Sequence, residues 1–85
     1  MNRNELFESY NNALETNKGF MVAFISLPDM ETCEMIVNTS ENFEEKVKYY
    51  LKAYDKNMVH KHNPDIRIDR IEFFDDVDFF NYEIL

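Results

Sequence analysis

The residue types that could carry chemistry in this chain are two histidines, His60 and His62, and one cysteine, Cys33. With an aspartate from the C-terminal segment they could in principle complete a zinc site, because zinc is bound by histidine nitrogen, cysteine sulfur and carboxylate oxygen. A structural zinc site needs four such ligands at a recognisable spacing, and one cysteine with a single His-x-His pair does not supply it. We therefore expect the histidines in a solvated loop and predict no bound metal.

Nucleophilic and phosphate chemistry are disfavoured as well. Cys33 lies in the segment 32–38, where side chains alternate as in a strand, so we expect its thiol to be buried and unreactive. The only glycine, Gly19, cannot build a glycine-rich phosphate loop. An acid and base pair among the carboxylates would need a pocket, for which a domain this small has little volume. The sequence therefore predicts a protein that is not an enzyme and takes no cofactor.

The strongest charge signal is an acidic block at the C-terminus. The net charge is −8, and residues 71–85 contain five acidic and no basic side chains. Such a surface repels phosphate, which disfavours direct binding of nucleic acid. An ordered array of carboxylates could instead occupy a protein groove lined by Lys and Arg for DNA phosphates, and aromatic rings among the acids would add contact energy. The predicted partner-binding residues are Glu72, Asp75, Asp76, Asp78, Phe79, Phe80 and Glu83. In the alternative interpretation, the aromatic residues dock into the protein's own core and the carboxylates simply face water.

These residues must be positioned by a single domain spanning residues 1–85, because domains usually contain about 50 to 250 residues. No run approaches the roughly 18 apolar residues that would cross a bilayer, so we expect no membrane partner. The spacing of Leu6, Phe7, Tyr10 and Leu14 predicts a helix over residues 3–17. A capping box formed by Asn2 and Glu5 would start this helix, and Gly19 would supply a left-handed residue past its end.

Three further elements follow in the sequence. Residues 20–27 are apolar on both alternating faces, which is typical of a central strand, and residues 32–38 should pair with them in a hairpin. A second helix begins after the candidate caps Thr39, Ser40 and Asn42, and it carries the apolar stripe Phe43, Val47, Tyr50, Leu51 and Tyr54. A third strand begins at Asp65, and its inward register shifts near Asp69 and Arg70, where a β-bulge would reconcile the two halves.

The predicted fold is therefore α+β with the order α-β-β-α-β. Its three-stranded, mainly antiparallel sheet is packed by the helices and followed by a short C-terminal helix or tail. A capped C-terminal helix starting near Asp75 would align Val77, Phe80 and Ile84 on one face.

Three runs of sequence carry a family resemblance: residues 20–28, residues 34–38 and residues 41–50 with Ala53, Tyr54 and Asp55. Together they resemble short uncharacterised accessory proteins of Gram-positive phages and prophages. In size and acidity such proteins are similar to anti-restriction and anti-CRISPR inhibitors that imitate DNA. The resemblance implies a host or phage protein as the partner, and it carries over no catalytic or binding residue.

The sequence thus predicts a small, acidic, non-catalytic protein-interaction module. In its sharper form the module is a phage-type inhibitor that mimics the charge of DNA and blocks a nucleic-acid-binding host protein. The single cysteine indicates a reducing compartment, and hence a cytoplasmic location. The alternative from another class is a structural homo-oligomer, a dimer formed through a sheet edge or through the C-terminal aromatic tail.

Overall fold

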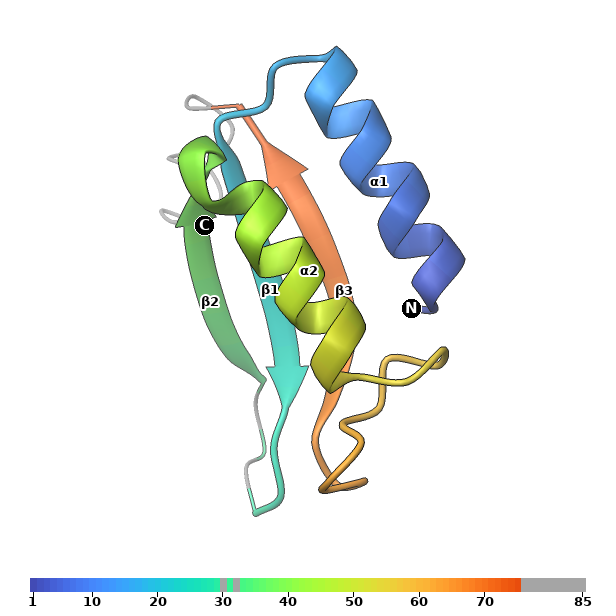
Figure 1. The fold of residues 1–85 in the computed structure, drawn as a ribbon. Helices are drawn as coiled ribbons and strands as arrows, with labels where there is room; N and C mark the ends of the chain where they lie inside the picture. Colours follow the sequence, from blue (N-terminus) through green and yellow to red (C-terminus); the bar gives the residue numbers. More distant parts are fainter. Residues whose placement is uncertain (30, 32, 76–85) are drawn as a thin grey trace.

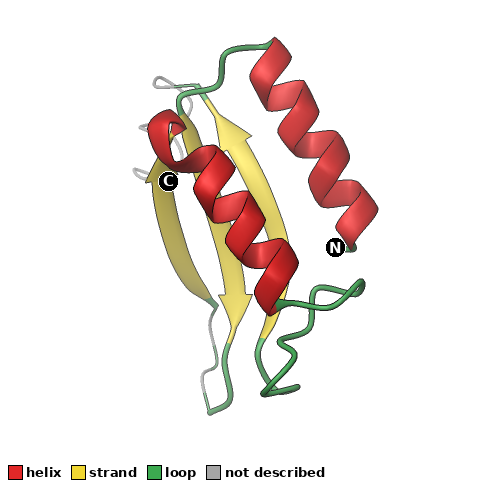
Figure 2. Cartoon of the chain, in the orientation of Figure 1, coloured by secondary structure: helices red, strands yellow, loops and turns green. Residues whose placement is uncertain are grey.

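The fold is a three-stranded antiparallel sheet with two helices on one of its faces (Figures 1 and 2). The computed structural model describes residues 1–29, 31 and 33–75. Its elements are α1 (Arg3–Glu15), β1 (Phe20–Ser26), β2 (Glu34–Thr39), a 3₁₀ turn (Ser40–Asn42), α2 (Phe43–Ala53) and β3 (Arg67–Phe74). The order across the sheet is β2-β1-β3. The predicted α+β fold and its order of elements are confirmed.

Strand β1 is the central strand, as its sequence predicts. Met21, Ala23 and Ile25 face the helices and belong to the core, whereas Val22 and Phe24 alternate with them on the opposite face. All five side chains are buried. A strand that is buried on both faces can tolerate almost no polar side chain, which explains why this run is apolar throughout.

A β-bulge interrupts the pairing of β1 with β3 at the predicted position. Phe24 is opposite Arg70, but the next residue, Ile25, is opposite Ile68, so Asp69 is the extra residue of β3. The Asp69 carboxylate accepts hydrogen bonds from the Ser26 hydroxyl and, at 3.0 Å, from Arg67 Nε. The bulge lets Ile68 and Ile71 both reach the core although they are an odd number of residues apart.

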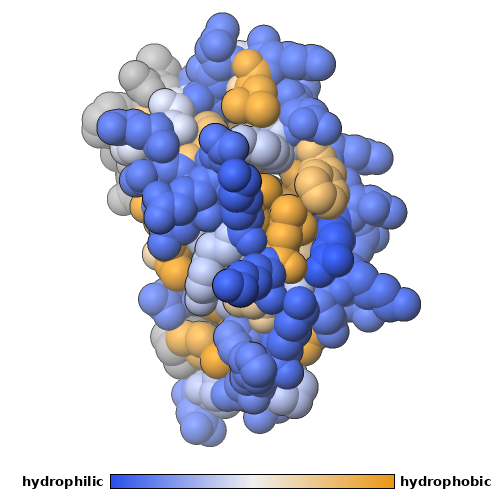
Figure 3. Space-filling model, viewed as in Figure 1, coloured by the Kyte–Doolittle hydropathy of each residue, from blue (hydrophilic) through white to orange (hydrophobic). Residues whose placement is uncertain are grey.

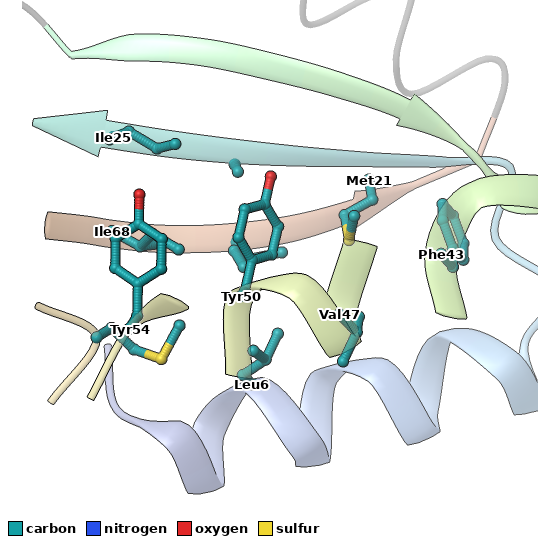
Figure 4. Packing of buried hydrophobic residues seen from close by; sticks show 11 residues of the cluster. Leu6, Met21, Ile25, Phe43, Val47, Tyr50, Tyr54 and Ile68 are labelled. Carbon is teal, nitrogen blue, oxygen red and sulfur yellow. The ribbon is translucent and has the colours of Figure 1, made fainter. Parts of the chain in front are cut away.

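Helix α2 supplies a large part of the core (Figure 4). Phe43, Val47, Tyr50 and Tyr54 are all buried and Leu51 is partly buried, so the predicted stripe is confirmed. The predicted side-chain cap is wrong, because neither Thr39 nor Asn42 makes a side-chain capping hydrogen bond. A 3₁₀ turn precedes the helix instead, and in it the Phe43 backbone N–H donates to the Ser40 carbonyl.

Helix α1 begins at its predicted capping box, in which the Asn2 side chain accepts from the Glu5 N–H and the Glu5 side chain accepts from the Asn2 N–H. Its predicted end is wrong. The helix stops at Glu15, and the left-handed residue is Asn17 with φ 53°, not Gly19. Asn tolerates this conformation, so the chain turns earlier than the glycine suggests. Gly19 instead donates to the Phe74 carbonyl at 3.0 Å and accepts from Ser40 at 3.1 Å.

Two other expectations have different outcomes. Cys33 is exposed and precedes β2, so the prediction of a buried thiol is wrong; the strand starts at Glu34, two residues later than predicted. The predicted C-terminal helix or tail lies outside the described residues, apart from its first position, Asp75. In the part of the chain that is described, neither helix has the length and apolar character needed to cross a membrane.

Candidate interaction surface

The predicted acidic site is described at two positions, Glu72 and Asp75. Glu72 lies on β3 and pairs with Arg70, whose Nε is 3.0 Å from Glu72 Oε1. Asp75 follows β3 and accepts from Lys18 Nζ at 3.4 Å. Their side chains are 40% and 53% exposed, so each carboxylate faces water on one side and a cation on the other. The other predicted site residues lie outside the described residues: Asp76, Asp78, Phe79, Phe80 and Glu83.

These two ion pairs affect how the carboxylates can act. An exposed pair is worth only about 0 to 1 kcal/mol, so a cationic partner could displace the internal cation. The pairing nevertheless reduces the local negative potential that would attract such a partner. The structure therefore brings Glu72 and Asp75 to one end of the sheet without leaving either as an isolated charge.

The sequence interpretation missed an exposed apolar row on α1. Leu6 and Ala13 are 0% and 1% exposed, whereas Phe7 and Leu14 are 43% and 53% exposed. Both pairs have the same seven-residue spacing, but the second is displaced by one residue and hence rotated by about 100° around the helix. One face of α1 can pack on β3, so the other row is left at the surface. The two parallel rows are visible in the sequence, but the sequence interpretation used Leu6, Phe7, Tyr10 and Leu14 only to predict the helix and did not separate them into rows.

The exposed row lies on the side of α1 that faces α2. We use the word furrow for the apolar surface between these two helices, from Arg3 at one end to the pocket beside Leu14 at the other (Figure 3). Arg3 fixes the lower end of the furrow, because its Nη2 donates to the carbonyls of Leu51 and Tyr54 at 3.1 Å each. These carbonyls belong to the last turn of α2, where a cation is also favoured by the helix dipole. Figure 3 shows apolar surface between the helices, framed by hydrophilic residues.

A small pocket of about 190 Å³ adjoins Leu14 at the other end of the furrow. It is lined by Ala13, Leu14, Asn17, Lys18, Ser40 and Phe43. The pocket is below the roughly 300 Å³ typical of a drug-sized ligand. Its size suits one apolar side chain of a partner protein better than a substrate.

The histidine loop between α2 and β3 is structural. His60 packs edge-on against Tyr54, with ring centroids 5.2 Å apart, and its Nδ1 accepts from the His62 backbone N–H at 3.1 Å. His62 is exposed, as expected for a solvated loop. Within residues 1–29, 31 and 33–75, no three His, Cys, Asp or Glu side chains lie close enough to hold a metal ion.

The groups with shifted pKa values also serve the fold. Burial raises the pKa of Tyr50 to about 12, with smaller contributions from Tyr54 and Tyr49, and burial likewise raises the pKa of Tyr54. The Val59 and Asn57 backbone N–H groups, of which Val59 has the larger effect, hold the pKa of Asp55 below its usual value. At neutral pH both tyrosines are therefore neutral core residues and Asp55 is a charged acceptor that orders the loop.

Comparisons with known protein families, with curated proteins and with solved structures find no match to this chain. The resemblance to accessory proteins of Gram-positive phages and prophages therefore stays a prediction.

Proposed function

We propose that this protein is a small, acidic, non-catalytic module that binds another protein through the furrow beside α1. The observation that carries the proposal is the exposure of Phe7 and Leu14, 43% and 53%, on a helix whose other apolar row is fully buried. Large apolar side chains in a row at a furrow are typical of a protein-binding surface. The family resemblance suggests that the partner is a host or phage protein.

The geometry supports tight binding because the surface is already ordered. Helix α1 is fixed at its start by the Asn2–Glu5 capping box and by the two hydrogen bonds of Arg3 to α2. A partner that covers Phe7 and Leu14 would gain hydrophobic free energy without having to order the helix. The adjoining pocket could accept one apolar anchor, and such anchors contribute most of the binding energy in many interfaces.

A double substitution of the exposed row tests this proposal. The partner, captured from a Gram-positive host lysate and then purified, is titrated with wild-type protein and with the Phe7→Ser, Leu14→Ser variant. We expect the variant to bind at least about tenfold more weakly, since two apolar contacts are lost. The matched control is Asn4→Ser with Asn11→Ser, which has the same spacing on the exposed side of α1, leaves the net charge unchanged and should bind normally. Equal affinities for all three proteins, each folded by circular dichroism, would refute the proposed surface.

The sharper form of the proposal, in which the protein mimics the charge of DNA, is supported by the net charge of −8. It predicts that affinity falls steeply with added salt, because a lysine- and arginine-lined groove must exchange counterions. It also predicts that reversing Glu72 and Asp75 to Lys weakens binding, after correction for the loss of their pairs with Arg70 and Lys18. Salt-independent binding would leave the apolar form and eliminate charge mimicry.

A further inference from the structure

The face of the sheet that points away from the helices is buried at its centre. Val22 and Phe24 of β1 lie on this face, and they are 0% and 2% exposed. Both described helices pack on the other face, where they meet Met21, Ala23 and Ile25 (Figure 2). When no layer packs on one face of an antiparallel sheet, the side chains of that face meet water. The burial of Val22 therefore requires a covering layer that neither helix supplies.

The covering layer lies over β1 and β3 and not over β2. Met35 and Val37 of β2 are the register partners of Phe24 and Val22, so they lie on the same face, yet they are 42% and 41% exposed. On the other side of β1, Phe74 of β3 lies on this face and is partly buried. The layer thus follows the half of the face that β1 and β3 form, which we call the β1–β3 half.

A cation lies beside this half. The Arg70 guanidinium is 4.0 Å from the centre of the Phe24 ring, which accounts for part of the burial of Phe24. The Arg70 side chain is 52% exposed, and its Nε donates to Glu72 at 3.0 Å. Because a guanidinium has five N–H donors, Arg70 can bind a further carboxylate beside Glu72. The β1–β3 half is therefore an apolar surface next to a cation, which suits a segment with both apolar and acidic side chains.

The segment 76–85 has this composition, and it follows β3 directly. Six of its residues are apolar and three are acidic: Val77, Phe79, Phe80, Tyr82, Ile84 and Leu85, with Asp76, Asp78 and Glu83. It starts after Asp75, which is held at the end of the sheet by Lys18 Nζ at 3.4 Å. Ten residues can span up to about 33 Å, whereas the seven residues of β1 span about 23 Å. The segment thus starts beside the β1–β3 half and is long enough to cross it.

We propose that residues 76–85 cover the β1–β3 half of this face, with their aromatic side chains packed on Val22 and Phe24. A segment of the same chain is present at a millimolar effective concentration, whereas a second copy would bring another net charge of −8. In this arrangement Phe79 and Phe80 are core residues of the chain itself and do not contact a partner. The acidic side chains of the segment stay at the surface, where Arg70 can meet one of them.

Solution NMR of the full chain tests this contact directly. We expect nuclear Overhauser effects between the methyl protons of Val22 and the ring protons of Phe79, Phe80 or Tyr82. In a mixture of isotope-labelled and unlabelled chains, an experiment that selects contacts between chains should show none of them. Contacts that appear only between chains would show that a second copy covers the face and would overturn the proposal. A Val22 without contacts to residues 76–85 would overturn it as well.

Thermal unfolding followed by circular dichroism measures how much the covering layer stabilises the fold. Phe79→Thr with Phe80→Thr should lower the Tm by about 10 °C or more, because two large apolar contacts are lost. The matched control, Met35→Thr with Val37→Thr, changes two residues on the exposed half of the same face and should lower the Tm by less than about 4 °C. Equal shifts for the two variants would contradict the proposal. The furrow beside α1 is not involved, so a failure here leaves the proposed function untouched, and the reverse also holds.

Discussion

Helices α1 and α2 pack on the same face of one sheet, yet they belong to the fold in different ways. α2 buries Phe43, Val47 and Tyr50, whereas α1 buries only Leu6 and Ala13. Tyr50 lies in the core together with Tyr54 and with the sheet residues Met21 and Ile68 (Figure 4). α2 is therefore held along most of its length.

α1 is held mainly at its N-terminal end and by the buried side chains of Leu6 and Ala13. Besides the capping box and Arg3, the N-terminal ammonium of Met1 donates to the Asp69 carbonyl at 3.2 Å, and the Arg3 N–H donates to the Lys56 carbonyl at 3.0 Å. Leu6 and Ala13 face the core, so Phe7 and Leu14, each one residue further round the helix, stay at the surface. The comparison teaches that a helix of similar length can be a core element or a presenting element, depending on which contacts secure it.

The largest test of this contrast compares Tyr50→Ala with Leu14→Ala. Truncating a buried aromatic residue should lower the free energy of unfolding by about 3–5 kcal/mol. The same truncation of the half-exposed Leu14 should change it by less than about 0.5 kcal/mol. Urea unfolding followed by circular dichroism measures both values, and similar losses for the two variants would erase the distinction between the helices.

A smaller effect is expected in alkaline solution, where Tyr50 of α2 and Tyr54 just after it lose their neutral form. The folded pKa of Tyr50 is about 12, against 10.0 for the free side chain. The raised value means that its contribution to stability is fully present below pH 10 and is lost as the pH rises toward 12, by up to about 3 kcal/mol for a shift of this size.

The variant Tyr50→Phe should remove that part of the pH dependence, measured by denaturant unfolding at a series of pH values. Tyr54→Phe serves as the control and should remove a separate part, because burial also raises the pKa of Tyr54. Identical alkaline profiles for Tyr50→Phe and the wild type would show that Tyr50 does not set the response.

The smallest expected effect comes from Arg3, which joins the two helices. Arg3→Ala removes two charge-assisted hydrogen bonds to the last turn of α2 and should cost about 2 kcal/mol. Arg3→Lys keeps the charge but not the planar fork and should recover only part of the loss. Hydrogen exchange at the amides of α1 should rise more than at those of α2, and equal protection of both helices would contradict the proposed tether.

Much of the fold could be predicted from the sequence because it rests on local patterns. The run at 20–26 is apolar on both faces, the stripe beginning at Phe43 repeats at helical spacing, and the change of register near Asp69 needs a bulge; each of these was confirmed. The errors occur where two local signals compete. Asn17 took the left-handed turn that the glycine suggested, and Cys33, which the alternation placed inside a strand, lies one residue before the start of β2.

By itself, then, the sequence determined the types and order of the elements, since periodicity and capping act over a few residues. Only the tertiary structure decided which of two equivalent apolar rows of α1 enters the core, which strand forms the outer edge of the sheet, and which carboxylates meet a cation. Leu6 and Phe7 are neighbours of equal apolar character, and nothing local separates them. Their difference arises because a helix can face β3 on only one side, and that side is chosen by contacts between segments far apart in the chain.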